Sequence, residues 1–388
     1  MLSGRVTNRA RYMENRMRLD IRDVPPTCVG IDLHKDTLTA AVLNRLTGEI
    51  SFVKLSCKCR QQIIEFFSKL PRPHVVAIET VGFYRWLWDL LEPICDKLVL
   101  ADATQCRALA GRRLKTDRED ASNVAELLSA GRCPLAWAPD SLVAELRSRT
   151  RQRNRLSRWH AKVLHVVKSV LNSVNFPGPS RADAAALHRW LEGAHAKLAD
   201  HHRVVIEDAV DQLVMIERQI ERAEREITRI VQGDRFKRNY EILDSIPGVG
   251  LVSAATILAE IGDFKRFGDR RAIACYAGLT PRVYNSADTV RHGRISKAGP
   301  RDLRWVLQQA AWTIIRDDGH TRGVFTRISK RAGRKKAAVA IARRMLTWAW
   351  TIVGKDELFV RKTINKLDAT NGDTTKSANK AERRKRSA

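Results

Sequence analysis

Four acidic residues stand where carboxylates could meet on one side of an α/β fold. Asp32 ends the apolar run at residues 29–32, and Glu79 ends the apolar run at 75–79. Acids at the ends of apolar strands are where α/β folds often carry their chemistry. Asp117 and Asp120 are three residues apart in a predicted helix, so their side chains share one helix face. Any one of them alone could be a turn or capping residue, but the four together predict an active site.

Four converging carboxylates suit one kind of ion and one kind of reaction. Mg²⁺ is a hard cation that proteins hold through carboxylates together with substrate phosphates. Two such ions about 4 Å apart stabilise the attacking and the leaving oxygens of an in-line phosphoryl displacement. The acids therefore predict a Mg²⁺ site that cleaves or transfers phosphodiesters.

Two serines near the C-terminal end lie in a strongly basic segment. Residues 265–304 hold ten Lys or Arg and three acids, and they include Ser286 and Ser296. A serine that attacks phosphorus needs an aligned hydroxyl and neutralisation of the phosphate charge, which neighbouring cations supply. Taken singly, each serine could equally be a loop or capping hydroxyl. The segment is a candidate for covalent phosphoryl chemistry.

The composition favours a nucleic-acid partner. The 388 residues include 70 Lys or Arg against 43 Asp or Glu, a formal net charge of +27. A hydrophobic fraction of 44% excludes a wholly disordered basic protein. No run of about 20 apolar residues predicts a membrane span, and the start of the chain lacks a signal peptide. We expect a cytosolic (cytoplasmic) protein with reduced cysteines and no zinc site.

The elements that must position the acids come first in the chain. Strand patterns at 27–33, 37–43 and 50–55 are joined by tight turns, and strands at 75–79 and 98–101 then alternate with helices at 61–70, 83–95 and 116–130. A hairpin meander followed by alternating strand and helix predicts an RNase H-like α/β domain. An all-parallel, doubly wound sheet fits less well, because the first two connections are too short for crossovers.

The rest of the chain is predicted to be mainly helical. Residues 145–168 predict a helix with a basic face, and apolar residues recur every three or four positions between Ile206 and Ile230. That seam predicts either a long helix in an intramolecular bundle or a dimerising or antiparallel coiled coil. Residues 243–253 are typical of a helix-hairpin-helix turn, whose glycines allow close approach to a DNA phosphate. A plain tight connection between helices is the alternative.

We therefore divide the chain into five parts: a basic flexible arm (1–26), a catalytic α/β domain (27–140), a basic helix and coiled-coil region (141–236), a C-terminal domain (237–360) and a basic disordered tail (361–388). Basic and glycine positions in the parts 141–236 and 237–360 are the predicted nucleic-acid contacts: Arg151, Arg153, Arg155, Gly248, Gly250, Arg294, Lys297, Arg301, Arg334, Lys335 and Lys336.

Six short motifs resemble the DEDD transposases of the insertion-sequence one-ten family. They are Gly-Ile-Asp-Leu-His-Lys (30–35), Ala-Ile-Glu-Thr (77–80), Lys-Thr-Asp-Arg-Glu-Asp-Ala (115–121), Ile-Pro-Gly-Val-Gly (246–250), Ala-Gly-Leu-Thr-Pro (277–281) and Gly-Arg-Ile-Ser-Lys-Ala-Gly (293–299). The resemblance covers most of the chain. It implies a RuvC-like domain in which Asp32, Glu79, Asp117 and Asp120 hold Mg²⁺.

The resemblance also implies a mechanism and partners. A serine that follows the Gly-Leu-Thr-Pro motif attacks DNA and forms a phosphoserine link, which points to Ser286 here, with Ser296 as the second candidate. Such proteins resemble one another in using a non-coding guide RNA, in acting on donor and target DNA, and in assembling as dimers or tetramers. The family's serine usually precedes Gly, whereas Ala287 follows it here.

Two other classes of protein stay open at this point. One is a RuvC-like junction endonuclease that uses the acids with water as the nucleophile. The other is a non-catalytic nucleic-acid binder. The RNA that co-purifies with the protein, once sequenced, would test the guide hypothesis directly.

Overall fold

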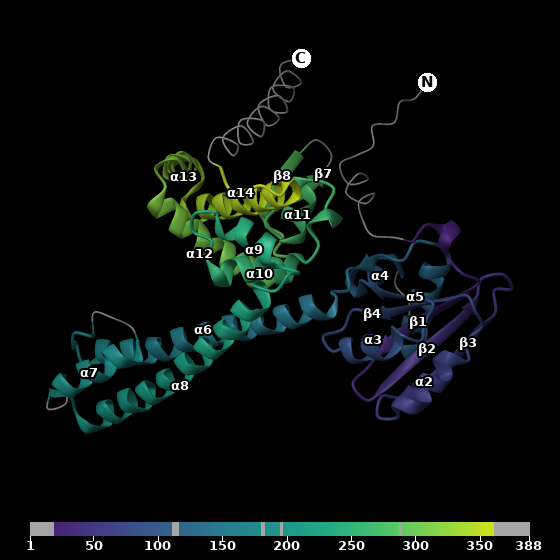
Figure 1. Ribbon diagram of the computed structural model, residues 1–388, viewed down its shortest axis with the longest axis horizontal. Helices are drawn as coiled ribbons and strands as arrows, with labels where there is room; N and C mark the ends of the chain where they lie inside the picture. The colour runs from purple at the N-terminus through teal and green to yellow at the C-terminus, as the bar shows by residue number, and fades with distance from the viewer. Residues whose placement is uncertain (1–18, 111–115, 180–182, 195–196, 287–288, 361–388) are drawn as a thin grey trace, which may run out of the picture. The chain divides into compact units, whose positions relative to one another are not determined.

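The computed structural model describes residues 19–110, 116–179, 183–194, 197–286 and 289–360. The chain forms two compact units, Met1–Ala138 and Pro139–Ala388 (Figure 1). Apolar strand sequences dominate the first unit, and amphipathic helices dominate the second. In the described part of the chain, no helix is both long enough and apolar enough to cross a membrane.

The first unit is built on a six-stranded sheet in the order β3-β2-β1-β4-β5-β6. The first three strands pair antiparallel, β1 pairs parallel with β4, β4 parallel with β5, and β5 antiparallel with β6. The strands are β1 (Thr27–Leu33), β2 (Thr37–Asn44), β3 (Ile50–Ser56), β4 (His74–Glu79), β5 (Lys97–Ala101) and β6 (Leu135–Ala136). The mixed α/β fold predicted for this region is confirmed, and it fits the RuvC-like architecture.

Helices cover both faces of this sheet. Alternate residues of β1 point to opposite faces, as the pleat requires. Val29 and Ile31 pack on the side of α2 (Arg60–Ser68) and α3 (Arg85–Leu91). Cys28 packs on the side of α4 (Ala103–Ala110) and α5 (Asp117–Ser129). The sheet is therefore the middle of three layers. Each strand side chain faces either α2 and α3 or α4 and α5.

The second unit begins with two long helices that lie side by side, α6 and α8, with α7 against the end of α8 (Figure 1). A group of shorter helices follows. The helices are α6 (Ser141–Ser173), α7 (Ala184–Ala194), α8 (Asp200–Val231), α9 (Lys237–Asp244), α10 (Leu251–Ile261), α11 (Arg270–Tyr276), α12 (Arg301–Asp317), α13 (Gly319–Ala332) and α14 (Arg334–Lys355).

The apolar seam of α8 is buried mainly towards its two ends. Ile206, Leu213 and Ile227 are buried, whereas Ile216 and Ile220 are half-buried. The seam packs within the chain against α6, and near α7 it joins a core that includes Leu187 and Leu191. The long-helix prediction for this region thus has an intramolecular partner.

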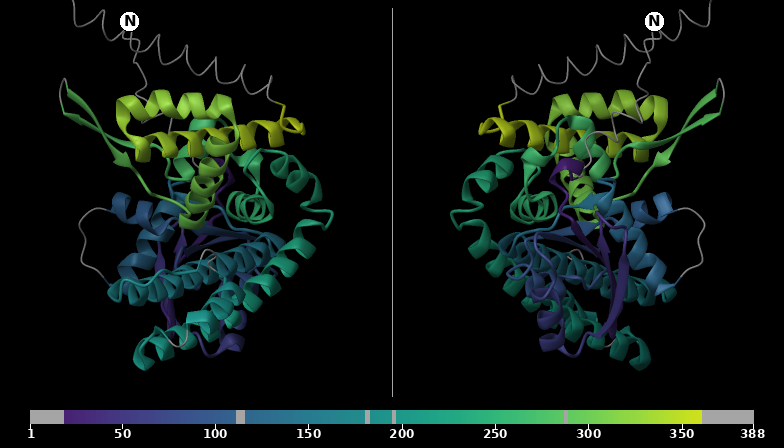
Figure 2. Two further views of the ribbon diagram at one scale, coloured as in Figure 1. Left: turned by 90° about the vertical axis from the view of Figure 1, so that its left-hand side faces the viewer. Right: turned by 90° about the vertical axis from the view of Figure 1, so that its right-hand side faces the viewer.

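Two features of the fold differ from the sequence prediction. A two-stranded antiparallel hairpin, β7 (Pro281–Ser286) and β8 (Thr289–Ile295), projects from the C-terminal helices, where we expected helix and loop (Figure 2). The predicted helix at 83–95 is shorter, because α3 ends before Pro93. The arm 1–26 lies outside the described residues up to position 18, and the tail 361–388 lies outside them completely.

Candidate active site

A row of polar side chains crosses four strands of the sheet. The register pairs Asp32 on β1 with Thr39 on β2, and Thr39 with Lys54 on β3. On the other side of β1, the last paired residues of β1 and β4 are Ile31 and Ile78. Asp32 and Glu79 each follow directly after that pair, so they lie at the same end of neighbouring strands. The residues adjoining Asp32 and Glu79 pack on the opposite face. The pleat therefore turns Asp32 and Glu79 towards the face that α5 covers.

Helix α5 lies unusually close to β1. A Cβ atom at Gly30 would stand 2.3 Å from the carbonyl oxygen of Ala121 and 2.5 Å from the amide nitrogen of Ala125. Only glycine leaves room for that approach. The close contact brings the first turn of α5, which carries Asp117 and Asp120, to the side of the sheet that Asp32 faces near the end of β1.

The start of α5 is fixed by a capping hydrogen bond. Thr116 is the N-cap, and its Oγ1 accepts a hydrogen bond from the backbone N–H of Glu119 at 3.2 Å. Asp117 and Asp120 fall in the first turn, where the helix dipole favours negative charge. The cap therefore places two carboxyl groups at a defined point of the helix, where the dipole favours negative charge.

Two side chains with nitrogen atoms contact the aspartates. His34 Nε2 lies 3.0 Å from Asp32 Oδ2 and 3.3 Å from Asp117 Oδ1. Lys54 Nζ donates a hydrogen bond to Asp117 Oδ2 at 3.1 Å. Among the acids, Asp32 and Glu79 are buried, and Asp117 and Asp120 are partly exposed. The cluster is thus closed towards the sheet and open at α5.

The pKa values show that the acids interact. Burial raises the pKa of Asp32; the charge of His34 opposes this, and the charges of Asp120 and Asp117 add to it. Burial also raises the pKa of Glu79, and the charges of Asp32 and Asp120 add to the effect. The hydrogen bond from Lys54 is the main cause that lowers the pKa of Asp117. The predicted acids therefore form one electrostatic cluster.

The donor set fits a divalent cation. Asp32, His34 and Asp117 each offer one ligand atom, and these three atoms lie within 4.8 Å of one another. Asp32 Oδ2 and Thr39 Oγ1 are buried and have no hydrogen-bond partner among the described residues. Carboxylate oxygens at such spacing suit Mg²⁺ or a similar ion.

A depression of about 430 Å³ lies beside Asp117. Its lining includes Lys54 and Arg118, and the Arg118 guanidinium lies over the ring of Phe52 at 5.7 Å. Two cations next to a carboxylate cluster can hold a phosphate whose reacting atoms face the acids. The geometry thus places groups that could hold a metal ion beside a depression with two cationic side chains.

Ser286 is the last residue of β7, and it pairs with Thr289 at the tip of the hairpin. Ala287 lies outside the described residues. Ser296 follows β8, where its N–H donates to Thr280 O at 2.8 Å and its Oγ accepts from the N–H of Ala298 at 3.4 Å. Ser296 is therefore part of a local turn, whereas Ser286 stands at the end of a projecting element.

The base of this hairpin is held by two interlocked glycines. Gly278 has φ +69° and Gly299 has φ +93°, in the region that favours glycine. A Cβ at Gly278 would stand 2.1 Å from Ala298 O, and one at Gly299 would stand 1.8 Å from Tyr276 O. The Gly-Leu-Thr-Pro motif and the Ala-Gly pair at 298–299 therefore pack on each other and fix the root of the strands that carry Ser286.

Some predicted nucleic-acid contacts are engaged inside the second unit. Arg151 donates two hydrogen bonds to Glu260, at 2.7 and 2.9 Å, and Arg153 donates to Glu224 at 2.9 and 2.7 Å. A Cβ at Gly248 would stand 2.8 Å from a carbonyl oxygen of α12. These three positions contribute to packing of the unit, and their side chains or backbone face neighbouring helices.

The other predicted contacts are exposed. Arg155 lies over the ring of Trp159 at 5.9 Å, and Gly250 is the N-cap of α10 with open space around it. The remaining positions are exposed ends and turns of β8, α12 and α14: Arg294, Lys297, Arg301, Arg334, Lys335 and Lys336.

Sequence reasoning missed three residues of the cluster, namely His34, Thr39 and Lys54. A signal for them existed in the strand pattern. The short turn at 34–36 fixes the register of β1 and β2, so counting back from it places Thr39 opposite Asp32. Counting on through β3 places Lys54 opposite Thr39. His34 stands two residues after Asp32 and so follows it on the same side of the strand.

An antiparallel meander continued by parallel strands, with acids at the strand ends and on the covering helix, defines the class of RuvC-like, carboxylate-bearing nucleic-acid enzymes. Comparison with known proteins gives the family. Residues 29–176 match a DEDD model of the IS110 type, described as "Transposase", and residues 240–326 match the "Transposase IS116/IS110/IS902 family".

Several curated proteins are similar to this chain. A probable family 20 transposase of Pseudomonas aeruginosa is 27% identical over 85% of this chain and 98% of its own length. The putative transposase y4pF/y4sB of Sinorhizobium fredii is 24% identical over 85% of each chain. The transposase for insertion sequence element IS1111A of Coxiella burnetii is 23% identical over 63% of this chain and 68% of its own. The chain belongs to the IS110/IS116 family of DEDD transposases and is an enzyme of insertion-sequence transposition.

Proposed function

We propose that this transposase cleaves and rejoins DNA through a covalent phosphoserine intermediate. Asp32, Glu79, Asp117 and Asp120 would hold Mg²⁺, and Ser286 would be the nucleophile. The observation that carries the proposal is the buried pair Asp32 and Glu79, whose pKa values are raised by burial and by the charges of neighbouring acids, together with a buried carboxylate oxygen of Asp32 that has no hydrogen-bond partner among the described residues.

The chemistry is a transesterification. The Ser286 hydroxyl loses its proton as Oγ attacks phosphorus, a P–Oγ bond forms, and the bond from phosphorus to one deoxyribose oxygen breaks. That oxygen takes up a proton and leaves as a hydroxyl. Mg²⁺, when bound, neutralises charge on the phosphate oxygens. Lys54 and Arg118 beside Asp117 would orient the phosphate. The reverse attack by a DNA hydroxyl reseals the strand without ATP.

The exposed cations would hold nucleic-acid backbones around this chemistry. We propose that Arg155, the residues after β8 and the start of α14 contact donor DNA, target DNA and a guide RNA. Backbone contacts position the strands, while base pairing with the guide selects the sequence. Residues 27–140 would serve as the catalytic domain and 237–360 as the serine-bearing domain. Assembly as a dimer or tetramer belongs to the same proposal.

A trapping experiment with single variants tests the catalytic assignment. Wild-type protein with a DNA substrate and Mg²⁺ should give a protein–DNA adduct that survives denaturation, and it should give recombinant product. Ser286→Ala should abolish both the adduct and the product, whereas Ser296→Ala should keep the adduct. Asp117→Asn should reduce product by at least about 100-fold, because a displaced metal ligand removes charge stabilisation in the transition state.

The outcomes separate the proposal from its rivals. A Ser286→Ala protein that still nicks DNA in Mg²⁺ would identify a water-using nuclease. A Ser286→Ala protein that still forms adducts, while Ser296→Ala does not, would move the nucleophile to Ser296. Unchanged recombination by Asp117→Asn and Glu79→Gln would remove the carboxylate mechanism and favour a binding protein.

A further inference from the structure

The imidazole of His34 lies where a third metal ligand would lie. Its backbone N–H donates to Thr37 O at 2.9 Å within the turn between β1 and β2, which fixes the residue. Its side chain is 54% exposed, so the ring can be reached from solvent. The ring nitrogen Nε2 nevertheless contacts both Asp32 and Asp117, one from the sheet and one from α5.

The spacing of these atoms matches the ligands of one octahedral ion. Ligands about 2.1 Å from a common ion are about 3.0 Å apart along an edge of the octahedron and about 4.2 Å apart across it. The observed separations from Nε2 to the two carboxylate oxygens are 3.0 and 3.3 Å, and the three ligand atoms lie within 4.8 Å of one another. The distances from Nε2 to Asp32 Oδ2 and to Asp117 Oδ1 are thus close to the edge length of such an octahedron.

The contact with Asp32 is one of two that the same ring nitrogen makes with carboxylates. Asp32 Oδ2 is buried and accepts no hydrogen bond from any described residue, although Nε2 is only 3.0 Å away. Nε2 carries at most one N–H but faces oxygens of both Asp32 and Asp117, so one aligned hydrogen bond does not account for both contacts. A buried carboxylate oxygen left in this way costs free energy unless another group satisfies it. Thr39 Oγ1, the next polar atom along the row, is also buried without a partner among the described residues.

We propose that His34 is a direct nitrogen ligand of the divalent ion held by Asp32 and Asp117, and that it makes the site prefer a transition ion such as Mn²⁺ over Mg²⁺. Mg²⁺ takes oxygen ligands almost exclusively, whereas first-row transition ions accept imidazole readily. The inference rests on the proposed function for the carboxylates, but it adds a ligand to their set and a preference among ions.

Pulsed EPR of Mn²⁺ bound to the full chain tests the proposal without any activity measurement. The protein is used without an affinity tag, and Mn²⁺ is added below one equivalent. A directly ligated imidazole nitrogen gives a ¹⁴N coupling to the Mn²⁺ electron spin. We expect the coupling in the wild type and in a His165→Ala control, whose exposed histidine lies on α6. We expect it to vanish in His34→Ala and in His34→Gln.

Calorimetry gives a second readout. His34→Ala should weaken Mn²⁺ binding by at least about 10-fold, which is the lower limit for loss even of outer-shell partners, and should weaken Mg²⁺ binding less. Persistence of the ¹⁴N coupling in both His34 variants would overturn the proposal, as would its absence from a wild type that binds Mn²⁺. In the latter case, if Asp117→Asn still abolishes Mn²⁺ binding, the carboxylate site stands and only the role of His34 falls. Failure of Mn²⁺ to bind the wild type would remove both.

Discussion

Single side chains decide how the acids of the cluster keep their charge. Asp32 is buried, and its burial raises its pKa, whereas a hydrogen bond from Lys54 holds the pKa of Asp117 below the usual range. Glu79 has a more distant cation, with Arg107 Nη2 4.0 Å from its Oε1. The pKa of Asp117 is therefore shifted in the opposite direction from those of Asp32 and Glu79, and a bound cation would favour the charged forms of the two buried acids.

The close approach at Gly30 yields a prediction about stability. Gly30→Ala places a Cβ against two backbone atoms of α5, which cannot rotate away. We expect a loss of about 3 kcal/mol in the free energy of unfolding, the upper part of the usual range for overpacked positions. Because α5 carries Asp117 and Asp120, metal affinity should fall as well. Denaturant unfolding and metal calorimetry measure the two effects.

Gly82→Ala is the matched control for this change. Gly82 is exposed in a turn of the same unit, and a Cβ there meets nothing within 4 Å. Its cost should stay within about 0.5 kcal/mol, as for ordinary surface substitutions. Equal stability and equal metal affinity in Gly30→Ala and Gly82→Ala would contradict the role assigned to the contact of α5 with β1.

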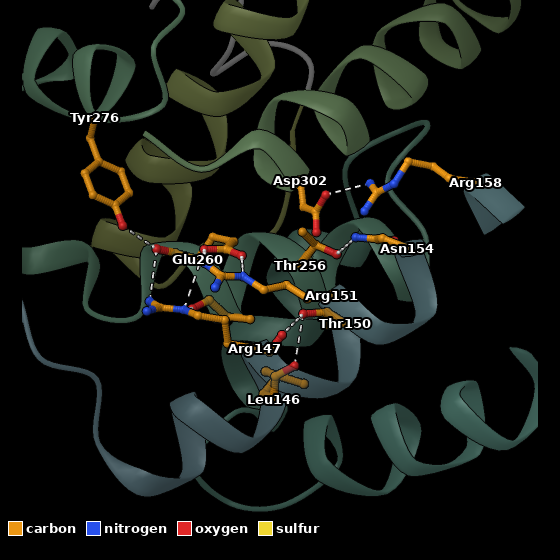
Figure 3. A network of polar contacts seen from close by, with 11 residues as sticks. Leu146, Arg147, Thr150, Arg151, Asn154, Arg158, Thr256, Glu260, Tyr276 and Asp302 are labelled. Atoms are coloured by element: carbon orange, nitrogen blue, oxygen red, sulfur yellow. Dashed lines mark hydrogen bonds and ion pairs between the residues drawn. The ribbon is translucent and has the colours of Figure 1, made fainter. Parts of the chain in front are cut away.

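At the scale of elements, several arginines of α6 form ion pairs inside the second unit. Arg147 and Arg151 pair with the buried Glu260 of α10, and Arg158 pairs with Asp302 of α12 at 2.7 Å (Figure 3). Between them, Asn154 donates to Thr256 at 3.4 Å. These contacts fix α6 to the C-terminal helices. The composition of α6 predicted a nucleic-acid surface, but three of its arginines form ion pairs with acids of the C-terminal helices.

Glu260 should therefore matter more for stability than an exposed acid does. Its side chain is 1% exposed, and Tyr276 Oη also donates to its carbonyl oxygen at 2.9 Å. Glu260→Ala removes the ion pair of Arg151 at 2.7 Å and the ion-pair contact of the mostly buried Arg147 at 3.6 Å. Removing one member of a buried ion pair typically costs about 3–5 kcal/mol. We expect a loss of this size in the free energy of unfolding, measured by denaturant titration followed by circular dichroism.

The comparison for Glu260 is an exposed pair on α8. Glu221 and Arg225 are about equally exposed and 3.9 Å apart, so Glu221→Ala should cost less than about 1 kcal/mol. If the two alanine variants unfold at the same denaturant concentration, the network around Glu260 does not hold α6 in place.

How far the elements could be predicted from the sequence depends on the range of the forces that form them. The strands β1 to β3 and helix α5 carry local signals, namely alternation, tight turns and the cap at Thr116, and their predicted ranges agree with the structure to within a residue or two. The pleat then places Asp32 and Glu79 on one face. Those parts of the fold and site followed from local chemistry.

Other parts depend on contacts that a single sequence does not reveal. The pairing of Arg151 with Glu260 joins residues more than one hundred positions apart. The β7–β8 strands are basic and lack clear alternation, and their root is fixed by the packing of Gly278 against Ala298. Charge alone could not separate Arg151, which pairs with the buried Glu260, from Arg334, which lies in the first turn of α14 among other cations.

At the scale of the whole molecule, the net charge of +27 is distributed unevenly among paired and exposed cations. The first turn of α14 holds Arg334, Lys335 and Lys336, with no acid and no side-chain cap. The helix dipole disfavours cations at this end, so the cluster costs stability unless an anion binds there. We propose that this cluster, together with a basic depression of about 570 Å³ along α13, contacts a nucleic-acid backbone.

This charge cluster gives a prediction about the salt dependence of binding. Each phosphate contact on duplex DNA adds about 0.9 to the slope of log K against log salt concentration. Replacing Arg334, Lys335 and Lys336 by alanine should therefore reduce the slope by about 2.7, equally for unrelated duplex sequences. Fluorescence anisotropy at several salt concentrations measures the slope.

A control that removes the same charge elsewhere decides whether location matters. Arg218, Arg222 and Arg225 are exposed on α8, where acids such as Glu221 lie among them. Their triple alanine variant lowers the net charge equally, so a general field effect would reduce the slope as much as the α14 variant does. Because counterions are released by cations that contact phosphates, we expect a clearly smaller change from the α8 variant. Equal slopes in the two variants would mean that the total charge, rather than the start of α14, holds the nucleic acid.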